Sequence, residues 1–455
     1  MYSAYITTLK ELHKHPNADR LQCSTVFGNN VIVDLSYVKG QRVIYFPVDG
    51  QLSEEFATEN NLVKKYIPVT ELDDSHIAGK TIINKDGVDC INVGGYMDAD
   101  KRNITAIKLR GEKSDGLVLP IETLSKYVDI ATLRDGDQIT VIDGHEICRK
   151  YIPKRKKNHT NSSNKHINKK ELKEEVSYPF FTPHIDTQQL AYNMNAFHEG
   201  DTIYLTQKLH GSSFRVSNAL EVTTRKRPHW IKKIFNIGDK VTKKYGIISG
   251  TRRMILRNYD GGYYGSNLFR KKYNDMFVDK LPKGFTVYGE IVGWINETTP
   301  IMPRCSNSKV KDKEFSRMYG KETVFTYGCD PGENDCYIYR ITITNDDGVV
   351  VELPTEDVII WCEKLGVKYV PLLEKFIYTT WDDLNKRCEK YLDIPEPLSN
   401  GKHITEGVCV RIDNREIFSC YKTKSFYFKV LEGLIKDIAD APDIEEAEEL
   451  LDGEI

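Results

Sequence analysis

The stretch YLTQKLHGSSFRV, residues 204–216, interrupts a β-strand pattern with a lysine, a histidine and a glycine. The residues on either side alternate between apolar and polar, as half-buried strands do. Either the lysine points to solvent from a hairpin turn, or it is buried and used, because an unpaired buried ammonium is costly. Taken alone, the stretch favours the turn. The rest of the chain must decide between the two interpretations.

Length and composition indicate a globular protein of two or three domains. The formal net charge is −2, so total charge identifies no class of partner. Ten cysteines without a C-x-x-C pair argue against a zinc site or a disulfide framework, and they are typical of a reducing compartment. The sequence has neither the apolar core of a signal peptide nor a run of 18 apolar residues. We therefore expect a cytoplasmic protein without a membrane span.

A basic segment divides the chain. Residues 149–173 contain ten lysines or arginines and one acid, Glu171, around an Asn/Ser-rich centre without apolar periodicity. This composition predicts a flexible linker over residues 149–176. The linker is either a solvated tether or a contact for nucleic acid, since basic chains gain affinity for phosphates by counterion release.

The segment before the linker, residues 1–148, reads as short strands separated by turns. Examples are NNVIVDLSYV (29–38), QRVIYFPVDG (41–50) and DQITVIDGHEI (137–147). Strands at this spacing predict a small barrel, and HKHPNADRLQ (13–22) resembles the opening of tRNA-binding OB modules. We predict an OB-like β-barrel that binds nucleic acid.

The segment after the linker, residues 177–437, predicts an α+β domain of mainly antiparallel sheets. Strand-like runs such as FTVYGEIVGW (285–294) and EGVCVRI (406–412) have β-type composition. Helix-like segments lie at HWIKKIFNIGDKVTKKYG (229–246) and PTEDVIIWCEKLG (354–366). Residues 438–455 form a predicted acidic tail.

Charged residues recur inside these strand-like runs. Each alone has an ordinary explanation, as a surface charge or as half of a salt bridge. Lys422 and Lys424 share one face of their strand, because side chains alternate with a period of two. The candidates, in chain order, are Lys208, Arg225, Glu290, Glu406, Lys422 and Lys424.

In this order, the candidates resemble the covalent nucleotidyltransferase superfamily of polynucleotide ligases and RNA-capping enzymes. The pattern is Lys-x-x-Gly, an arginine strand, aromatic-Gly-Glu, Glu-Gly-apolar and Lys-x-Lys. KLHGSSF (208–214), HIDTQQL (184–190), SGTRR (249–253) and LRGEKSDGLVLP (109–120) are similar to ATP-dependent, nick-sealing RNA ligases. The OB-like module also precedes the catalytic domain, as in that subgroup.

The resemblance implies a three-step reaction with ATP and Mg²⁺ or Mn²⁺ as cofactors. Lys208 would attack the α-phosphate of ATP to give lysyl-AMP, which needs the neutral amine rather than the ammonium. AMP would then pass to a 5′-phosphate, and a 3′-OH would complete the joint. Glu406 would lie at the metal, directly or through water. The implied partner is nicked RNA or an RNA-containing duplex, and we expect a monomer.

The remaining residues receive binding roles from the same resemblance. Glu290 would hold the ribose, and Arg225 would contact the 5′-phosphate or the adenylate. Tyr337 and Tyr339 share one face of CYIYRI, and either could stack on adenine. Lys422 and Lys424 would neutralise the triphosphate.

Two departures from the pattern bear on this assignment. His210 stands where some relatives carry an acid, and Gln207 stands where nick-sealing RNA ligases often carry glutamate, so adenine recognition differs. The alternatives are a capping-type guanylyltransferase that uses GTP, a DNA ligase, and a non-catalytic nucleic-acid-binding protein with a retired ligase domain.

Overall fold

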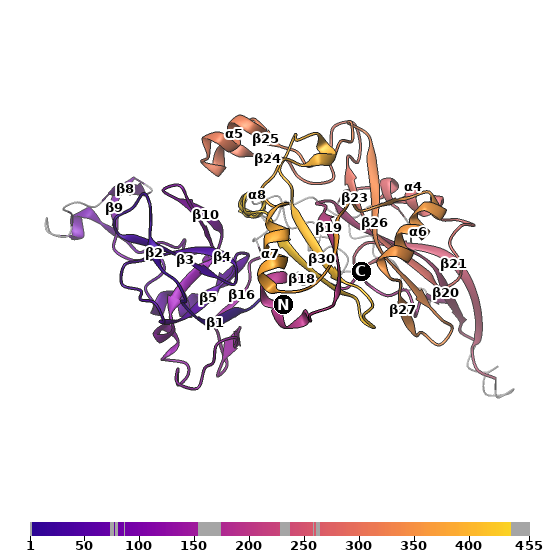
Figure 1. Cartoon of the computed structure of the whole chain (residues 1–455), viewed down its shortest axis with the longest axis horizontal. Coiled ribbons are helices and arrows are strands. Elements are labelled where there is room, and N and C mark those ends of the chain that lie inside the picture. Colours follow the sequence, from indigo (N-terminus) through magenta and orange to yellow (C-terminus); the bar gives the residue numbers. More distant parts are fainter. Residues whose placement is uncertain are drawn as a thin grey trace. The chain divides into compact units, whose positions relative to one another are not determined.

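Many short strands and few helices build the chain, in two units that Figure 1 shows as the computed structural model. The first unit contains Met1–Lys154 with Glu432–Asp437, and the second contains Arg155–Leu431. Most of the predicted linker and all of the predicted tail, residues 153–173 and 438–455, lie outside the described residues. The structure describes residues 2–72, 77, 81–85, 87–152, 174–227, 237–257, 259–260 and 264–437.

The N-terminal unit consists of small antiparallel sheets around one apolar core. Its four-stranded sheet has the order β12-β5-β1-β13, and β5 (Arg42–Phe46) is buried on both faces because its residues are apolar in succession. Among the described residues the strand pairings close no barrel, so the OB-like barrel stays a prediction. The core includes Ala4, Ile6, Ile44, Phe46, Leu52, Phe56, Leu119, Ile121, Leu124, Ile139 and Ile147.

Helix α1 of this unit is capped by a side chain. Ser53 precedes α1 (Glu54–Glu59), and its side chain accepts the amide of Phe56 at 3.1 Å, which caps the helix. The other elements are β1 Ala4–Thr8, β2 His13–Lys14, β3 Leu21–Val26, β4 Asn29–Asp34, β6 Gly50–Leu52, β7 Tyr66–Pro68, η1 Val69–Glu71, β8 Ile82–Lys85, β9 Val88–Asn92, β10 Ala106–Leu109, β11 Glu112–Asp115, β12 Leu117–Pro120, η2 Ile121–Leu124, β13 Gln138–Ile139, β14 Val141–Ile142, β15 His145–Glu146 and β16 Cys148–Lys150.

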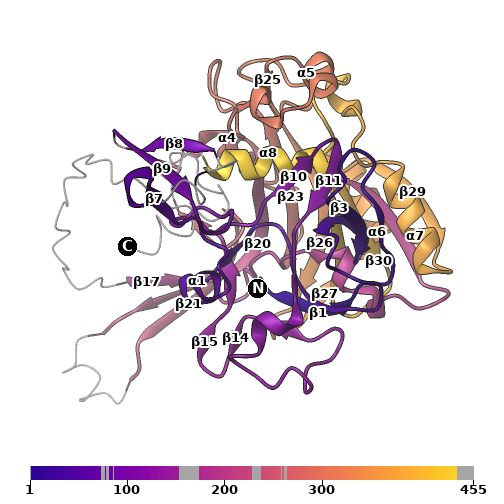
Figure 2. The same cartoon turned by 90° about the vertical axis from the view of Figure 1, so that its left-hand side faces the viewer.

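Two larger sheets form the second unit. One has the order β22-β21-β20-β23-β26-β27, with β17 beside β20 and β28 beside β26. Its longest strand, β20 (Ser212–Arg225), continues with β21 (Lys240–Gly250) beyond the rest of the sheet, and Figure 2 shows β17 beside this pair. The other sheet has the order β18-β31-β30-β19-β29. Most pairings are antiparallel, which agrees with the predicted α+β class.

An apolar core covers one face of the five-stranded sheet. Ile203 and Leu205 of β19 (Thr202–Lys208) point into it with Val408 and Val410 of β30 (Gly407–Ile412). Helix α7 (Trp381–Glu389) closes this core with Leu384 and Cys388. The alternate residues of β19 and β30 therefore face the other side of the sheet, where the polar candidates lie.

The expected helix at residues 229–246 is wrong over its second half. Lys240–Gly250 is strand β21, which pairs residue by residue with β20 from Arg215↔Gly250 to Arg225↔Lys240. Pairing with a long neighbour outweighs the local pattern of lysines and apolar residues. The expected helix at 354–366 is present as α6 (Thr355–Leu365).

The remaining elements follow in chain order, and the last of them, α8, contributes residues to both units. They are β17 Glu174–Ser177, β18 Gln188–Gln189, η3 Leu190–Tyr192, η4 Met194–Ala196, β22 Ile255–Leu256, α4 Leu268–Met276, β23 Phe285–Gly293, β24 Cys305–Ser306, η5 Asn307–Val310, α5 Lys313–Tyr319, β25 Glu322–Thr323, β26 Asn334–Thr344, β27 Val350–Glu352, β28 Lys368–Tyr369, β29 Leu372–Ile377, η6 Pro397–Ser399, β31 Ser419–Lys424 and α8 Phe426–Asp437.

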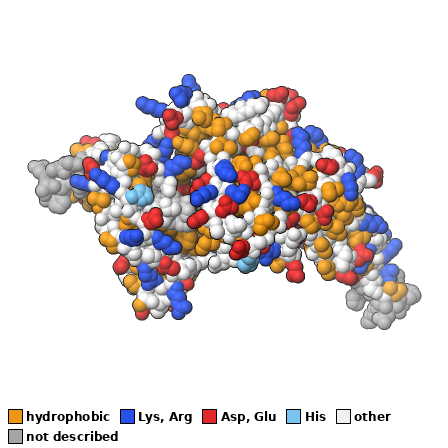
Figure 3. All heavy atoms as spheres, in the orientation of Figure 1, with side chains coloured by type: hydrophobic (Ala, Val, Ile, Leu, Met, Phe, Trp, Pro, Cys, Tyr) orange, Lys and Arg blue, Asp and Glu red, His pale blue; other side chains and the backbone are white. Residues whose placement is uncertain are grey.

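The surface carries both signs of charge. Figure 3 shows basic and acidic side chains interspersed over the face that it draws. Within the described residues, no helix combines the length and the apolar character that a membrane crossing requires. All ten cysteines are free thiols.

Candidate active site

Lys208 is the last residue of β19, and its ammonium is paired. Its Nζ lies 2.8 Å from Oε1 of Glu406, and the two side chains are 21 % and 2 % exposed. The opening stretch therefore does not turn its lysine out to solvent. Glu406 immediately precedes β30, and Gly407 is the direct cross-strand partner of Lys208.

The pairing register brings the lysine pair to the same face. Gly407 is opposite Lys208 on one side and opposite Lys424 of β31 on the other. Lys422 lies one row further along, opposite Cys409. Directly opposed residues of a regular ladder share a face, and so do residues two apart. Three lysines thus line one face of the sheet, away from the apolar core.

Gly211 follows Lys208 at the start of the opposite sheet, where its backbone contacts Glu290. The amide of Gly211 donates to Oε1 of Glu290 at 3.1 Å. A Cβ at this position would lie 2.3 Å from the carbonyl oxygen of Ile291, so only glycine fits. The register of β20 and β23 sets Ser213 opposite Glu290. The Lys-x-x-Gly segment therefore bridges the two sheets.

Tyr327 holds the same segment from a third direction. Its hydroxyl oxygen accepts the backbone amide of His210 at 2.7 Å. Burial raises the pKa of Tyr327, and the carboxylates of Glu406, Glu396 and Glu290 raise it further. The sequence offered no indication of Tyr327, because a tyrosine in a loop has no distinctive spacing.

Gln207 forms a second buried polar pair. Its amide nitrogen Nε2 donates to both carboxylate oxygens of Glu396, and the two residues are 5 % and 0 % exposed. Oε1 of Glu396 also accepts the amide of Leu398 at 2.9 Å. Burial raises the pKa of Glu396, and the nearby Glu406 raises it further. Sequence reasoning missed Glu396, which lies between two prolines in a segment typical of a surface turn.

The two candidate tyrosines have different neighbours. Tyr337 of β26 is opposite Glu290 and is buried. The register shifts between Tyr288 and Gly289, which leaves Tyr339 as an additional residue of β26 in the ladder. Its hydroxyl lies 3.3 Å from Nδ1 of His184.

Arg225 is not brought to these residues. It is the last residue of β20 and pairs with Glu174 and Lys240. Ser213, which is opposite Glu290, lies twelve positions earlier on the same strand (225 − 213). At about 3.3 Å per residue, the separation along the strand is roughly 40 Å.

Two further segments noted in the sequence meet beside the site. The side chain of Arg252, from SGTRR, donates to Oδ1 of Asp186, from HIDTQQL, at 2.6 Å. Arg253 reaches the other oxygen of Asp186 at 3.4 Å. The backbone carbonyl of Arg252 also accepts the amide of His184, which contacts Tyr339. The segments therefore form one substructure.

A divalent cation fits the donor set at Glu406. Oε2 of Glu406 is buried and has no hydrogen-bond partner among the described residues. The described residues contain no group of three or more His, Cys, Asp or Glu side chains that could hold a metal ion. Mg²⁺ retains several waters and binds through one or two carboxylates plus phosphate oxygens, so a single carboxylate beside a nucleotide is an adequate anchor.

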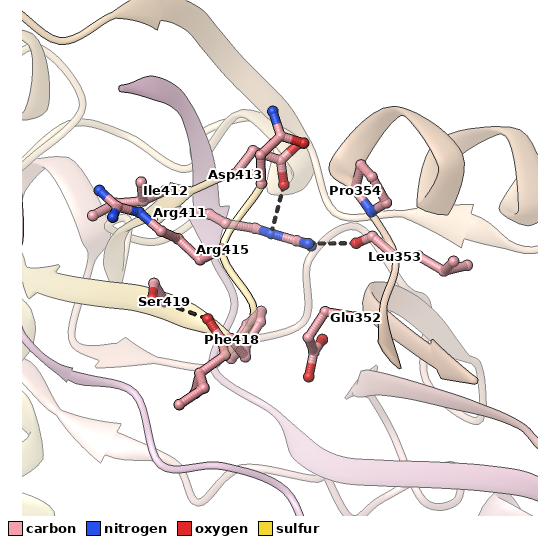
Figure 4. Close-up of a pocket in the computed structure, with 11 residues that line it drawn as sticks. Glu352, Leu353, Pro354, Arg411, Ile412, Asp413, Arg415, Phe418 and Ser419 are labelled. Carbon is pink, nitrogen blue, oxygen red and sulfur yellow. Dashed lines mark hydrogen bonds and ion pairs between the residues drawn. The ribbon is translucent and has the colours of Figure 1, made fainter. Parts of the chain in front are cut away.

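A small pocket lies around Arg411 of β30, further along the lysine-bearing face of the five-stranded sheet. Figure 4 shows the residues that line it. Arg411 lies in it, with Nε 3.2 Å from Oδ1 of Asp413 and Nη2 donating to the carbonyl of Leu353. Arg411 is four residues along β30 from Gly407, or roughly 13 Å. The hydrogen bond from Arg411 to Leu353 joins β30 to the segment before α6, and these contacts are separate from Lys208.

Comparison with known proteins identifies the family. The family model described as RNA ligase matches residues 201–431, which is half of the chain and includes every element of the site. No curated protein matches the chain.

Solved structures of Naegleria gruberi RNA ligase are similar in fold. A lysine-to-alanine variant with ATP and Mn has 18 % identity and a TM-score of 0.52, covering 94 % of this chain and 98 % of the other. The same ligase with PPi has 18 % identity and a TM-score of 0.52, covering 93 % and 97 %. A variant with AMP and Mn has 18 % identity and a TM-score of 0.52, covering 94 % and 97 %. The likeness extends over both units, and the mixed fold of mostly antiparallel sheets is that of these structures. With the match over 201–431, the chain belongs to the RNA ligase family.

Proposed function

We propose that the protein seals 3′-OH and 5′-phosphate ends of RNA, in nicked duplex, through a lysyl-AMP intermediate at Lys208. The observation that carries this proposal is the row Lys208, Gly407 and Lys424 on three neighbouring strands, with Glu406 at 2.8 Å from Lys208 Nζ. This face suits attack on a triphosphate, because it combines a nucleophile (Lys208), a buried acid (Glu406) and a further cation (Lys424).

In the first step, the neutral Nζ of Lys208 attacks the α-phosphorus of ATP. A nitrogen–phosphorus bond forms, the bond from the α-phosphorus to the bridging oxygen breaks, and pyrophosphate leaves with its electrons. Glu406 Oε1 orients Nζ and accepts its hydrogen bond before the proton passes to water. The cations Lys422 and Lys424 favour the neutral amine of Lys208 and neutralise the phosphates.

The second and third steps transfer AMP to the RNA and then release it. An oxygen of the RNA 5′-phosphate attacks the phosphorus of lysyl-AMP, an oxygen–phosphorus bond forms, the nitrogen–phosphorus bond breaks, and Nζ takes a proton from water so that Lys208 leaves as the amine. The 3′-OH then attacks the activated 5′-phosphorus, loses its proton, forms the phosphodiester and releases AMP.

The other residues bind and orient ATP. Glu290 holds the ribose hydroxyls, and Tyr337, which is opposite Glu290, stacks on adenine in preference to Tyr339. Gln207 contacts the base edge. Glu406 Oε2 holds Mg²⁺ or Mn²⁺, which neutralises phosphate charge when bound. The similar Naegleria gruberi ligase was solved with ATP and Mn, which supports this cofactor set.

The domain roles follow from where the chemistry lies. We assign residues 177–437 to catalysis, because Lys208, Glu290, Glu406 and the lysine pair all fall there. Residues 1–148 form a module for holding RNA, which would share the grip on a nick with the catalytic domain. Residues 149–176 act as the basic linker, and residues 438–455 as the acidic tail.

Covalent labelling tests the proposal. The full-length protein is incubated with ATP radiolabelled at the α-phosphate and Mg²⁺, then run on a denaturing gel. Wild type and Lys375→Ala should both carry label, because Lys375 of β29 is exposed and pairs with Glu356 of α6. Lys208→Ala should carry none. Label of undiminished intensity in Lys208→Ala, or transfer from GTP in place of ATP, would contradict the assignment.

A further inference from the structure

We infer that Glu396 sets the choice of ATP over GTP, by fixing which end of the Gln207 amide is offered to the base. This inference rests on the proposed function, because it requires that the nucleotide binds beside Lys208. Glu396 is fully buried, so it acts as a positioning residue and not as a nucleotide contact.

Glu396 fixes the orientation of Gln207. Both carboxylate oxygens of Glu396 accept from the same nitrogen, so the amide of Gln207 turns its NH₂ toward Glu396 and its carbonyl away from it. Both oxygens of Glu396 receive Nε2 of Gln207, and Oε1 also receives the amide of Leu398. The carboxylate is therefore anchored from two sides and holds the amide in one orientation.

One acceptor of Gln207 remains for a ligand. The carbonyl oxygen Oε1 of Gln207 has no hydrogen-bond partner within the described residues, and it is not among the buried unpartnered atoms there. It is thus an acceptor that a bound molecule can reach. Adenine presents an exocyclic amine, which donates to such an oxygen, whereas guanine presents the acceptor O6.

The pair of Gln207 and Glu396 lies next to the proposed nucleophile. Gln207 immediately precedes Lys208 on β19. Burial raises the pKa of Tyr337, and the carboxylates of Asp335 and Glu396 add to the shift, so Glu396 lies within electrostatic reach of the ring assigned to adenine. Gln207 and Lys208 are consecutive and therefore leave β19 on opposite faces, so a nucleotide at the end of the strand would meet Lys208 with its phosphates and Gln207 with its base edge.

Glu396→Gln exchanges the group that Gln207 offers to the base, from an acceptor to a donor, and keeps the shape of the side chain at position 396. In Glu396→Gln, the carbonyl of the new amide still accepts the amide of Leu398, so its NH₂ faces Gln207. Gln207 must then turn its own carbonyl to that NH₂ and offer its NH₂ to the base. A donor at this point suits O6 of a guanine-type base and opposes the amine of adenine.

The experiment measures initial rates of covalent adduct formation with ATP, GTP and ITP, each at a concentration below its KM. ITP presents the same O6 as GTP without the 2-amino group, so it isolates the atom that Gln207 reads. We expect Glu396→Gln to lower the ratio of ATP to ITP rates by at least ~10-fold, as expected for exchanging a hydrogen bond for an opposed pair. Gln207→Met should also lower the ratio, because it removes the acceptor.

A double variant and a control separate orientation from a general loss of packing. In Gln207→Glu combined with Glu396→Gln, the carboxylate moves to the other side of the pair and again offers an acceptor to the base, so preference for ATP should return. Glu374→Gln, on β29, should leave the ratio unchanged, because Glu374 binds Arg387 and Tyr391 instead.

The outcomes distinguish the two proposals. No adduct from wild type and ATP would overturn the proposed function itself. An adduct whose ATP-to-ITP ratio stays at the wild-type value in Glu396→Gln and in Gln207→Met would overturn only the role of Glu396. Equal losses for all three nucleotides would mean that the pair is structural, and they would overturn the inference as well.

Discussion

Nζ of Lys208 and Oε1 of Glu406 lie 2.8 Å apart, on neighbouring strands whose register sets Lys208 opposite the residue that follows Glu406. The acid is 2 % exposed and its second oxygen has no partner in the described part of the chain. A buried carboxylate with one oxygen on an ammonium and the other open is incompletely satisfied. A metal ion that carries the triphosphate would bind at this second oxygen and satisfy the carboxylate.

Glu406→Gln should therefore reduce adduct formation by at least ~100-fold, because a neutral amide holds Nζ and a divalent cation more weakly than a carboxylate does. Glu356→Gln, which removes an exposed Lys–Glu pair between α6 and β29, is the matched control and should stay within about twofold. The measurement is the single-turnover rate at saturating ATP over a range of Mg²⁺ concentrations. If Glu406→Gln reaches the wild-type single-turnover rate without added Mg²⁺, the assignment of Glu406 to the metal is contradicted.

Tyr327→Phe should slow adduct formation by roughly 10-fold while leaving the fold intact. The substitution removes the oxygen that accepts the amide of His210 and leaves that donor unpaired, at a cost of about 1–3 kcal/mol. Because the bond fixes the loop between Lys208 and Gly211, kcat should fall more than the KM for ATP rises. Unchanged kcat in a folded variant would show that Tyr327 does not position the loop.

The sequence predicted the parts of the site that lie on regular strands. Lys422 and Lys424 were placed on one face because strand alternation is periodic, and a period can be read from one sequence. Lys208, Glu290 and Glu406 were joined to them by the order of motifs along the chain, which resembles that of the nucleotidyltransferases.

The rest depended on contacts that no local pattern encodes. Tyr327 and Glu396 lie in loops, and only the fold brings them to Lys208 and Gln207. Arg225 was expected near the site because the resemblance implied an arginine strand there, and the sequence did not show how far β20 extends. The segment around Lys240 looked helical until its pairing with β20 was known. For Arg225 and Lys240, long-range strand pairing outweighs the local pattern.

His403 makes the site sensitive to acid. Burial lowers the pKa of His403 to about 4, and its Nε2 accepts the amide of Tyr327 at 3.4 Å while Nδ1 faces the carbonyl of Ile404 at 3.0 Å. The unfolded chain binds the proton more tightly, with a pKa near 6.5. The stabilising contribution is therefore complete above pH 6.5 and is lost as the pH falls from 6.5 toward 4.

The test compares the free energy of unfolding in urea at pH 7.5 and pH 5. His403→Gln keeps an acceptor for Tyr327 but cannot be protonated, so its stability should depend less on pH than that of wild type over this interval. The wild-type loss should not exceed about 3 kcal/mol. His13→Gln, on the exposed strand β2, should behave as wild type. Parallel pH profiles for wild type and His403→Gln would refute the role of His403.

Arg225→Ala should leave adduct formation within about twofold of wild type. The residue lies roughly 40 Å along β20 from the position opposite Glu290, beyond the reach of any side chain. Rates with ATP alone provide the measurement. A loss of more than ~10-fold in a soluble variant would mean that the end of β20 contacts the nucleotide site in solution.

The last prediction concerns the basic linker, whose charged core Lys154, Arg155, Lys156 and Lys157 lies outside the described residues. Adduct formation requires only ATP and a metal, so replacing these four residues by glutamine should not change it. Binding of a nicked duplex should weaken most at low salt, because each neutralised phosphate releases counterions. The slope of log K against log salt should become shallower by about 0.9 for each phosphate that the variant no longer neutralises. Binding is measured by titrating nicked RNA from 50 to 200 mM salt. If the slope is unchanged, the linker is a solvated tether, and the contacts that grip the nick belong to the folded units alone.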